Sequence, residues 1–184
     1  MQWRNTPYRY GLISMLLHWG IALCVFGLFG LGVWMVELDY YSSWSHRAPA
    51  LHKSLGLTLF ALMLLRLFWR FISPPPPALN SYSRLTRLGA AFGHAALYLG
   101  LFALMVSGYL ISTADGRGIA VFGLFEVPAS ITSLPDQEDL AGWVHEYLAW
   151  GLVIFAGLHG LAALKHHFID RDATLTRMLG RRAD

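Results

Sequence analysis

Residues 140–164 read LAGWVHEYLAWGLVIFAGLHGLAAL, an apolar run that contains two histidines, His145 and His159. About 20 apolar residues are enough for a helix to cross a bilayer, so this run predicts one membrane span. A separation of 14 residues puts both imidazoles on one helix face, within about 40° of each other and about 21 Å apart along the axis. Ionisable side chains at membrane depth are costly and mark a candidate functional site.

Three similar apolar runs precede this one, at about residues 10–36, 51–71 and 88–112. Charged residues, four consecutive prolines at 74–77 and an Asp115-Gly116 turn separate the runs. The first run is longer than the apolar core of a signal peptide and is followed by no small-residue cleavage site, so we expect a retained helix. The sequence predicts an all-α membrane protein with a four-transmembrane-helix bundle, forming a single domain over residues 1–184.

Composition supports this fold class. The chain is 55% hydrophobic and 14% charged, against about 25% charged residues in globular domains. These values exclude a disordered chain, a nucleic-acid-binding domain and an ordinary soluble enzyme. The single cysteine, Cys24, excludes a disulfide framework and cysteine-held metal clusters.

The basic residues predict the orientation, because lysine and arginine concentrate on the cytoplasmic side. Arg47, Lys53 and Arg117 fall on one side together with most of the acidic residues, which makes that side external. We therefore expect a multi-pass protein of the bacterial inner (plasma) membrane with both termini in the cytoplasm. The other basic residues fall in the two tails and the second connection: Arg4, Arg9, Arg66, Arg70, Arg84, Arg87, Lys165, Arg171, Arg177, Arg181 and Arg182.

The sequence also predicts where two segments outside the spans lie. The apolar stretch 119–127 is expected at the external mouth of the bundle. The tail at 172–182 has two readings. One is a short amphipathic helix on the inner leaflet, with Leu175, Met178 and Leu179 facing lipid. The other is a solvated basic end.

Depth pairs the histidines that lie within the spans. The second run begins outside, so His52 lies at the outer level with His145. The first run begins inside, so His18 lies at the inner level with His159. His94 lies at the inner level too. For each histidine the alternative is a neutral imidazole bonded to a neighbouring helix.

Paired imidazoles favour a haem, because iron in a porphyrin needs only two axial ligands, whereas zinc needs about four. Glu146 is the only carboxylate near either pair. The chain has no C-x-x-C-H motif, which predicts a non-covalent, b-type haem. Glycines near the histidines supply room for the macrocycle or else serve close helix packing: Gly56, Gly142, Gly151, Gly157 and Gly160.

Several short segments together resemble the bacterial cytochrome b561 family of four-helix dihaem membrane proteins, over essentially the whole chain. The segments are His18-Trp19, LHKSLG at 51–56, LLRL at 64–67 with the proline run, Gly93-His94, VFGL at 121–124 with Pro128, WVHE at 143–146, GLHG at 157–160 and LKHH at 164–167. The resemblance implies that His18 and His159 ligate the inner haem iron and that His52 and His145 ligate the outer one. It makes His94 a haem neighbour that bonds a quinone or a propionate, and it favours His166 as part of a quinone site.

Two haem levels predict electron transfer across the bilayer. Ubiquinone is the expected partner in the membrane, with His94, His166, His167, Lys165 and Arg87 as candidate proton donors or ligands. For the last turn near Lys165 the alternative is a snorkelling interfacial end. Similar stand-alone proteins include superoxide oxidases, which pass an electron from superoxide to ubiquinone. A positive entrance formed by Arg47, Lys53, Arg117 and His46 suits that anion, although Lys53 has the alternative of neutralising a haem propionate.

Two other functions remain open from the sequence. The first is a cytochrome b electron-transfer or anchor subunit of a periplasmic dehydrogenase or hydrogenase-like complex. The second is a membrane protein that moves a metal ion, which the lack of carboxylates in the spans disfavours. Expected partners are membrane lipids, ubiquinone, and superoxide or a periplasmic electron donor, with no nucleic acid.

Overall fold

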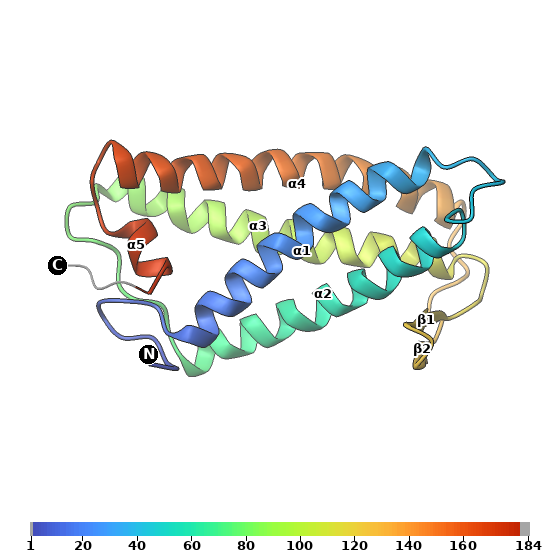
Figure 1. The fold of residues 1–184 in the computed structure, drawn as a ribbon, viewed down its shortest axis with the longest axis horizontal. Coiled ribbons are helices and arrows are strands. Elements are labelled where there is room, and N and C mark those ends of the chain that lie inside the picture. The colour runs from blue at the N-terminus through green and yellow to red at the C-terminus, as the bar shows by residue number, and fades with distance from the viewer. Residues whose placement is uncertain (1, 181–184) are drawn as a thin grey trace. The chain divides into compact units, whose positions relative to one another are not determined.

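The computed structural model describes residues 2–180 and confirms the expected four long helices (Figure 1). All four are long and apolar enough to cross a membrane. Three of them extend the predicted runs by one to four residues at each end, because flanking polar residues continue the helix. The elements are α1 (Leu12–Val36), α2 (Arg47–Ile72), α3 (Arg84–Thr113), β1 (Ile119–Val121), β2 (Phe125–Val127), α4 (Gln137–Phe168) and α5 (Thr174–Met178).

Local chemistry explains where these helices begin and end. Pro49 is tolerated because it lies in the first turn of α2, and the four prolines after Ser73 prevent the helix from continuing. Acidic residues occupy the first turn of α4 and basic residues its last turn, which matches the helix dipole. Arg66 and Arg70 lie inside α2, Arg84 and Arg87 inside α3, and Lys165 inside α4. The assignment of the first four to the connection between the second and third spans, and of Lys165 to the C-terminal tail, was therefore wrong.

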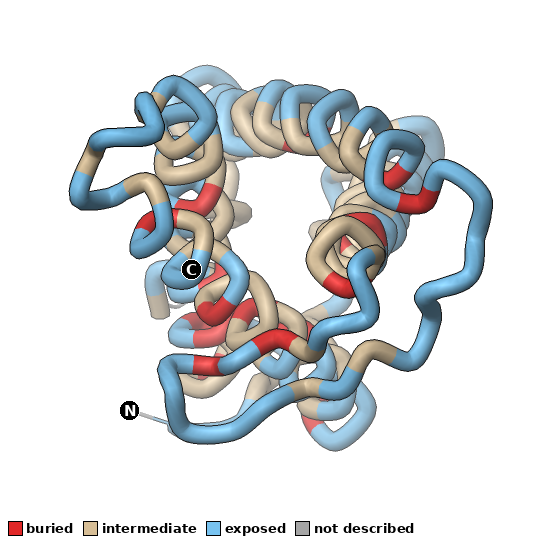
Figure 2. Tube along the Cα trace, turned by 90° about the vertical axis from the view of Figure 1, so that its right-hand side faces the viewer, coloured by how far each residue is buried: buried red, intermediate tan, exposed pale blue. Residues whose placement is uncertain are grey.

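Few side chains are buried along the four long helices (Figure 2). In the most apolar window of each helix the buried share ranges from 22% in α1 to 6% in α4. Large apolar side chains such as Leu23 and Phe71 are more than three-quarters exposed. Such faces are stable in lipid rather than in water, which agrees with a membrane protein.

The chain consists of two compact units, which are described separately. The terminal unit comprises residues 1–22, 62–98 and 154–184, and the hairpin unit comprises residues 23–61 and 99–153. Each unit therefore contains one segment of each long helix. His18, His94 and His159 fall in the terminal unit, and His52 and His145 fall in the hairpin unit.

In the hairpin unit the apolar stretch 119–127 folds into an antiparallel hairpin, which the sequence analysis did not foresee. Its turn places Phe122 and Gly123 at positive φ angles of 49° and 70°, and Leu124 N–H donates to the Val121 carbonyl. Turns of this kind need positive φ at both central residues, which glycine adopts without strain. Ser54 of α2 anchors the hairpin, because its Oγ accepts a bond from Phe122 N–H at 3.1 Å.

In the terminal unit the N-terminal segment, the end of α2 and α5 are joined by hydrogen bonds. Asn5 N–H donates to Ser73 Oγ at 2.8 Å. The guanidinium of Arg177 donates to the carbonyl oxygens of Pro7 and Pro77, both at 3.0 Å, and only 7% of this residue is exposed. The reading of this tail as a solvated basic end is therefore wrong as far as residue 180. Arg181 and Arg182 lie outside the described residues.

Candidate functional site

The hairpin unit brings His52 of α2 and His145 of α4 together. Their ring centres lie 6.2 Å apart, with an angle of 71° between the ring planes. His145 Nδ1 lies 3.0 Å from the Leu104 carbonyl oxygen and 3.1 Å from Ser107 Oγ. A carbonyl only accepts hydrogen bonds, so this contact assigns the proton to Nδ1 and leaves the lone pair on Nε2. That is the arrangement of an imidazole ready to ligate a metal.

Two glycines from other helices lie directly against these rings. A Cβ built on Gly108 of α3 would lie 3.0 Å from His145 Cε1, and one on Gly32 of α1 would lie 3.3 Å from His52 Cε1. His52 Nδ1 is buried and has no hydrogen-bond partner among the described residues. A larger residue at either glycine would therefore collide with the ring it faces.

The glycines expected to make room for a macrocycle do not contact the histidine rings. A Cβ on each would meet no atom within 4 Å: Gly56, Gly142, Gly151, Gly157 and Gly160. The sequence reasoning missed Gly32 and Gly108, which lie on helices other than those that carry the histidines they touch. No local spacing pointed to them.

The terminal unit brings three histidines together. The ring centres of His18 and His159 lie 6.4 Å apart at 85°, and those of His94 and His159 lie 5.5 Å apart at 70°. His94 is thus nearer to His159 than His18 is. The geometry places His94 at the same cluster, as its depth predicted.

Ring separations test whether a metal ion fits between the imidazoles of a pair. Two metal–nitrogen bonds of about 2.0–2.1 Å, plus about 1.1 Å from each nitrogen to its ring centre, give a centre-to-centre separation of about 6.3 Å. The His52–His145 and His18–His159 pairs, at 6.2 and 6.4 Å, fit this value. The His94–His159 pair is shorter by nearly an ångström. The separations within the His52–His145 and His18–His159 pairs are thus compatible with a metal ion held between the two rings.

A model of the family described as prokaryotic cytochrome b561 matches residues 9–181. The chain belongs to this family. The match covers all four long helices and both histidine pairs.

Three relatives show how the resemblance extends along the chain. Cytochrome b561 homolog 2 of Escherichia coli (strain K12) is 56% identical over 181 residues, covering 98% of this chain and 96% of the relative. The probable superoxide oxidase CybB of Yersinia pestis is 30% identical, covering 93% and 96%. Cytochrome b561 homolog 1 of E. coli is 31% identical over 137 residues, covering 71% and 74%.

Membership in the cytochrome b561 family establishes the coarse function. The protein is a multi-pass membrane cytochrome that transfers electrons, and the family implies a b-type haem. The resemblance noted in the sequence is thereby confirmed.

The residues expected at a quinone site fall into two groups in this b561 protein. His166, Lys165 and Arg87 gather around Tyr82 and the loop after α4. His166 Nδ1 lies 2.8 Å from Asp170 Oδ2 and 3.0 Å from Asp172 Oδ2, and Lys165 pairs with Asp170 at 2.7 Å. Arg87 Nε donates to the Tyr82 carbonyl at 3.1 Å.

His94 forms the second group. It lies two helical turns along α3 from Arg87, a rise of about 10 Å. It lines a cavity of about 280 Å³ together with Leu67, Arg70, Ala91, Ala95 and Tyr98. Of the residues expected at the quinone site, His94 is the one beside this cavity.

The expected positive entrance is altered by one ion pair. Arg117 bonds Asp115 through Nε at 2.7 Å, and the bond lowers the pKa of that carboxyl below its ordinary value. Arg117 therefore adds little net positive charge. Lys53 remains exposed, and so does Arg47, the first residue of α2. The ring of His46 lies 6.5 Å from the ring of Tyr40.

The hydrogen bonds of Asp172 predict that the segment around α5 in the terminal unit becomes less stable in acid. Burial raises the pKa of Asp172, but hydrogen bonds from Thr174 and Tyr82 outweigh it and hold the pKa below its ordinary value. The ionised Asp172 carboxylate thus stabilises the folded protein above about pH 4. This stabilisation is lost as the pH falls through the pKa of Asp172 in the folded protein, which is lower than its pKa in the unfolded chain. We expect the protection factors of the amides of residues 173–178, which are the intrinsic exchange rates divided by the observed ones, to stay constant from pH 7 to 5 and to fall below about pH 4.

Two variants check this prediction by hydrogen exchange. Asp172→Asn should show the faster exchange already at pH 7, whereas Asp139→Asn, in the hairpin unit, should match the wild type. Equal protection in Asp172→Asn and the wild type at pH 7 would contradict the role of this carboxylate.

Proposed function

We propose that the protein is a dihaem b-type cytochrome, with His18 and His159 as axial ligands in the terminal unit and His52 and His145 in the hairpin unit. The observation that carries the proposal is the pair of ring separations, 6.4 and 6.2 Å, each close to the span of two axial bonds. We further propose that the terminal unit lies on the cytoplasmic side of the bacterial inner membrane, as the basic residues favour.

This chain's own residues have defined tasks in this proposal. The Leu104 carbonyl orients His145 and keeps its Nε2 unprotonated, and the absence of a side chain at Gly32 and Gly108 leaves room for the two rings of the hairpin unit. A bound haem would supply one-electron transfer, and the imidazoles of His18 and His159 in one unit and of His52 and His145 in the other would hold it.

α4 carries one proposed ligand of each pair, His145 and His159, 14 residues apart in the sequence. One histidine pair in each unit supports electron transfer between chemistry on the external side and chemistry on the cytoplasmic side.

For the external reaction we propose that superoxide gives up one electron and leaves as dioxygen. A relative at 30% identity is named probable superoxide oxidase, which supports this reaction. Exposed Lys53, next to His52 in sequence, and Arg47 supply positive charge that attracts the anion.

For the other side we propose ubiquinone as the acceptor of two electrons and two protons. The cavity beside His94 supports a binding position for the ubiquinone ring, since the His94 imidazole holds and donates a proton there. The Lys165, His166 and Arg87 group supports proton delivery from the aqueous side.

One experiment tests this reaction with a prediction about charge. Purified protein is mixed with a superoxide source and ubiquinone, and haem reduction is followed with and without superoxide dismutase. We expect fast, dismutase-sensitive reduction. Lys53→Gln and Arg47→Gln should each slow it roughly two- to fivefold at low salt and weaken its salt dependence, while Arg84→Gln, which removes an exposed cation of the terminal unit, should not. Reduction that is indifferent to dismutase would contradict superoxide as the donor.

The hairpin favours a second candidate function, that of an electron-transfer subunit for a periplasmic dehydrogenase. Phe122, Leu124 and Phe125 at its tip are 49%, 81% and 60% exposed, an apolar surface suited to a protein partner. Co-purification of a soluble redox protein, lost on Leu124→Ser, would support this function over a self-contained oxidase.

A further inference from the structure

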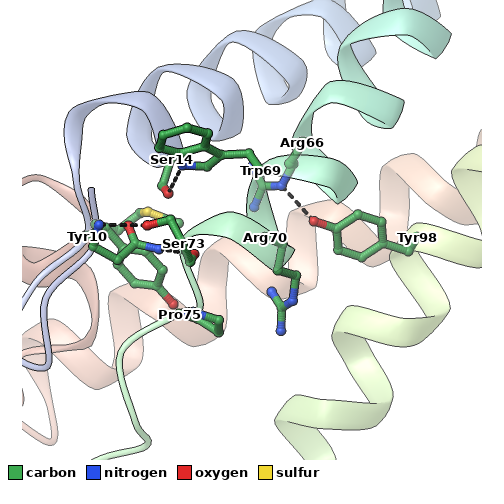
Figure 3. A pocket seen from close by; sticks show the side chains of 10 residues that line it. Tyr10, Ser14, Arg66, Trp69, Arg70, Ser73, Pro75 and Tyr98 are labelled. Carbon is green, nitrogen blue, oxygen red and sulfur yellow. Dashed lines mark hydrogen bonds between the residues drawn. The ribbon is translucent and has the colours of Figure 1, made fainter. Parts of the chain in front are cut away.

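Two arginines of α2 in the terminal unit, the half-buried Arg66 and the exposed Arg70, have no acidic partner among residues 2–180. Arg66 and Arg70 are one turn apart and line a small pocket together with Tyr98 of α3 (Figure 3). Arg66 Nε donates to Tyr98 Oη at 2.8 Å, and the guanidinium carbon lies 6.0 Å from the Tyr98 ring centre. Arg66 Nη1 is buried and has no hydrogen-bond partner among residues 2–180.

The other groups that line this pocket cannot neutralise the two charges. They are neutral side chains and backbone: Asn5, Tyr10, Ser14, Trp69, Ser73, Pro75, Tyr98 and Met178. Several already bond one another, as Trp69 Nε1 does with Ser14 Oγ at 3.1 Å. Every ion pair in the described part of the chain involves Arg117, Lys165 or His166.

A guanidinium at membrane depth is costly unless an anion or a polar cavity satisfies it. Tyr98, to which Arg66 donates, also lines the cavity beside His94, and the ring of His94 lies 5.5 Å from that of His159. An anion bound to Arg66 would therefore lie beside the cluster that the proposed function gives to the haem of the terminal unit.

We propose that Arg66 binds a carboxylate of that haem, a propionate, with Arg70 as the second cation of the same site. The proposal rests on the proposed function. A planar guanidinium is the side chain best suited to a carboxylate, because two parallel N–H groups match its two oxygens. Tyr98 orients the guanidinium through Nε, and the unpartnered Nη1 remains available to the ligand. A lipid phosphate shares this chemistry, and the experiment separates the two sources.

The test uses purified holoprotein and measures how fast each haem is lost to excess apomyoglobin. In Arg66→Gln we expect one of the two haems to leave about ten- to a hundredfold faster, the loss expected for a charge-assisted hydrogen bond, with the other unchanged. The midpoint potential of the same haem should fall, because a nearby positive charge favours the reduced iron. Arg84→Gln should match the wild type in both measurements.

Any other result contradicts either the role of Arg66 or the proposed dihaem function, and the two cases can be distinguished. A wild-type loss rate in Arg66→Gln overturns it. A loss of co-purified anionic phospholipid with unchanged haem retention overturns it in favour of a lipid headgroup. If Arg66→Gln does not accumulate, Arg66→Lys decides, since lysine lacks the planar fork and a wild-type rate there overturns the proposal. A wild-type protein without haem would refute the proposed function itself.

Discussion

His159→Ala is expected to abolish one of two low-spin haem signals and to lower the haem content from about two per chain to about one. His159 faces His18 at 6.4 Å, and His94 is the only other described imidazole whose ring lies within that distance of it. Alanine at position 159 removes the imidazole nitrogen that both the His18–His159 pair and the His94–His159 pair need. His18 and His94 then both lack the His159 imidazole that each of them faces. Electron paramagnetic resonance of the oxidised membranes and a haem assay on the purified variant measure this result.

His94→Ala is the matched control, because it removes a neighbouring imidazole without touching the proposed ligands. The 5.5 Å between the ring centres of His94 and His159 matches two metal–nitrogen bonds less well than the 6.4 Å between His18 and His159. We expect both signals to remain in this variant. Loss of a signal in His94→Ala, with both retained in His18→Ala, would assign His94 as the ligand and contradict the present pairing.

Gly108→Val is expected to remove the other haem signal, that of the hairpin unit. A Cβ at this position would lie 3.0 Å from His145 Cε1 and 3.2 Å from Nδ1, closer than side-chain atoms normally approach. The ring cannot retreat freely, since Nδ1 is bonded to the Leu104 carbonyl at 3.0 Å. Overpacking of this kind costs about 1–3 kcal/mol and moves the imidazole away from its partner. The haem assay and resonance spectrum used for His159→Ala measure this loss.

Gly27→Val of α1 is the control for helix propensity and size, because a Cβ there meets no atom within 4 Å. It should keep both haem signals and the same amount of protein in the membrane. Gly108→Ala, with fewer atoms, should give a weakened or shifted signal rather than none. Full retention of both signals in Gly108→Val would show that the ring of His145 is not held as described.

The helices and the histidine pairs could be predicted because both follow from local spacing. Apolar runs report helix length directly, and depth along a span follows from counting residues inward from its ends. His52 therefore met His145, and His18 met His159, as expected.

Contacts that depend on how one helix packs against another were not predictable in the same way. Gly32 and Gly108 touch histidines of other helices, and nothing in their own surroundings in the sequence distinguishes them from the remaining glycines. Arg66 was grouped with a connection by its charge, although α2 continues to Ile72 and carries it inward. The only sequence signal for the position of Arg66 was an arginine inside an apolar run. That arginine was counted among the basic residues that set the orientation.

The most direct measurement is the haem-to-protein ratio of the purified wild-type chain, together with its reduced-minus-oxidised spectrum. Two imidazole pairs of matching separation predict two non-covalent b-type haems per polypeptide, both six-coordinate and low-spin. A ratio of one, a high-spin iron or a protein without haem after expression with ample porphyrin supply would contradict the account.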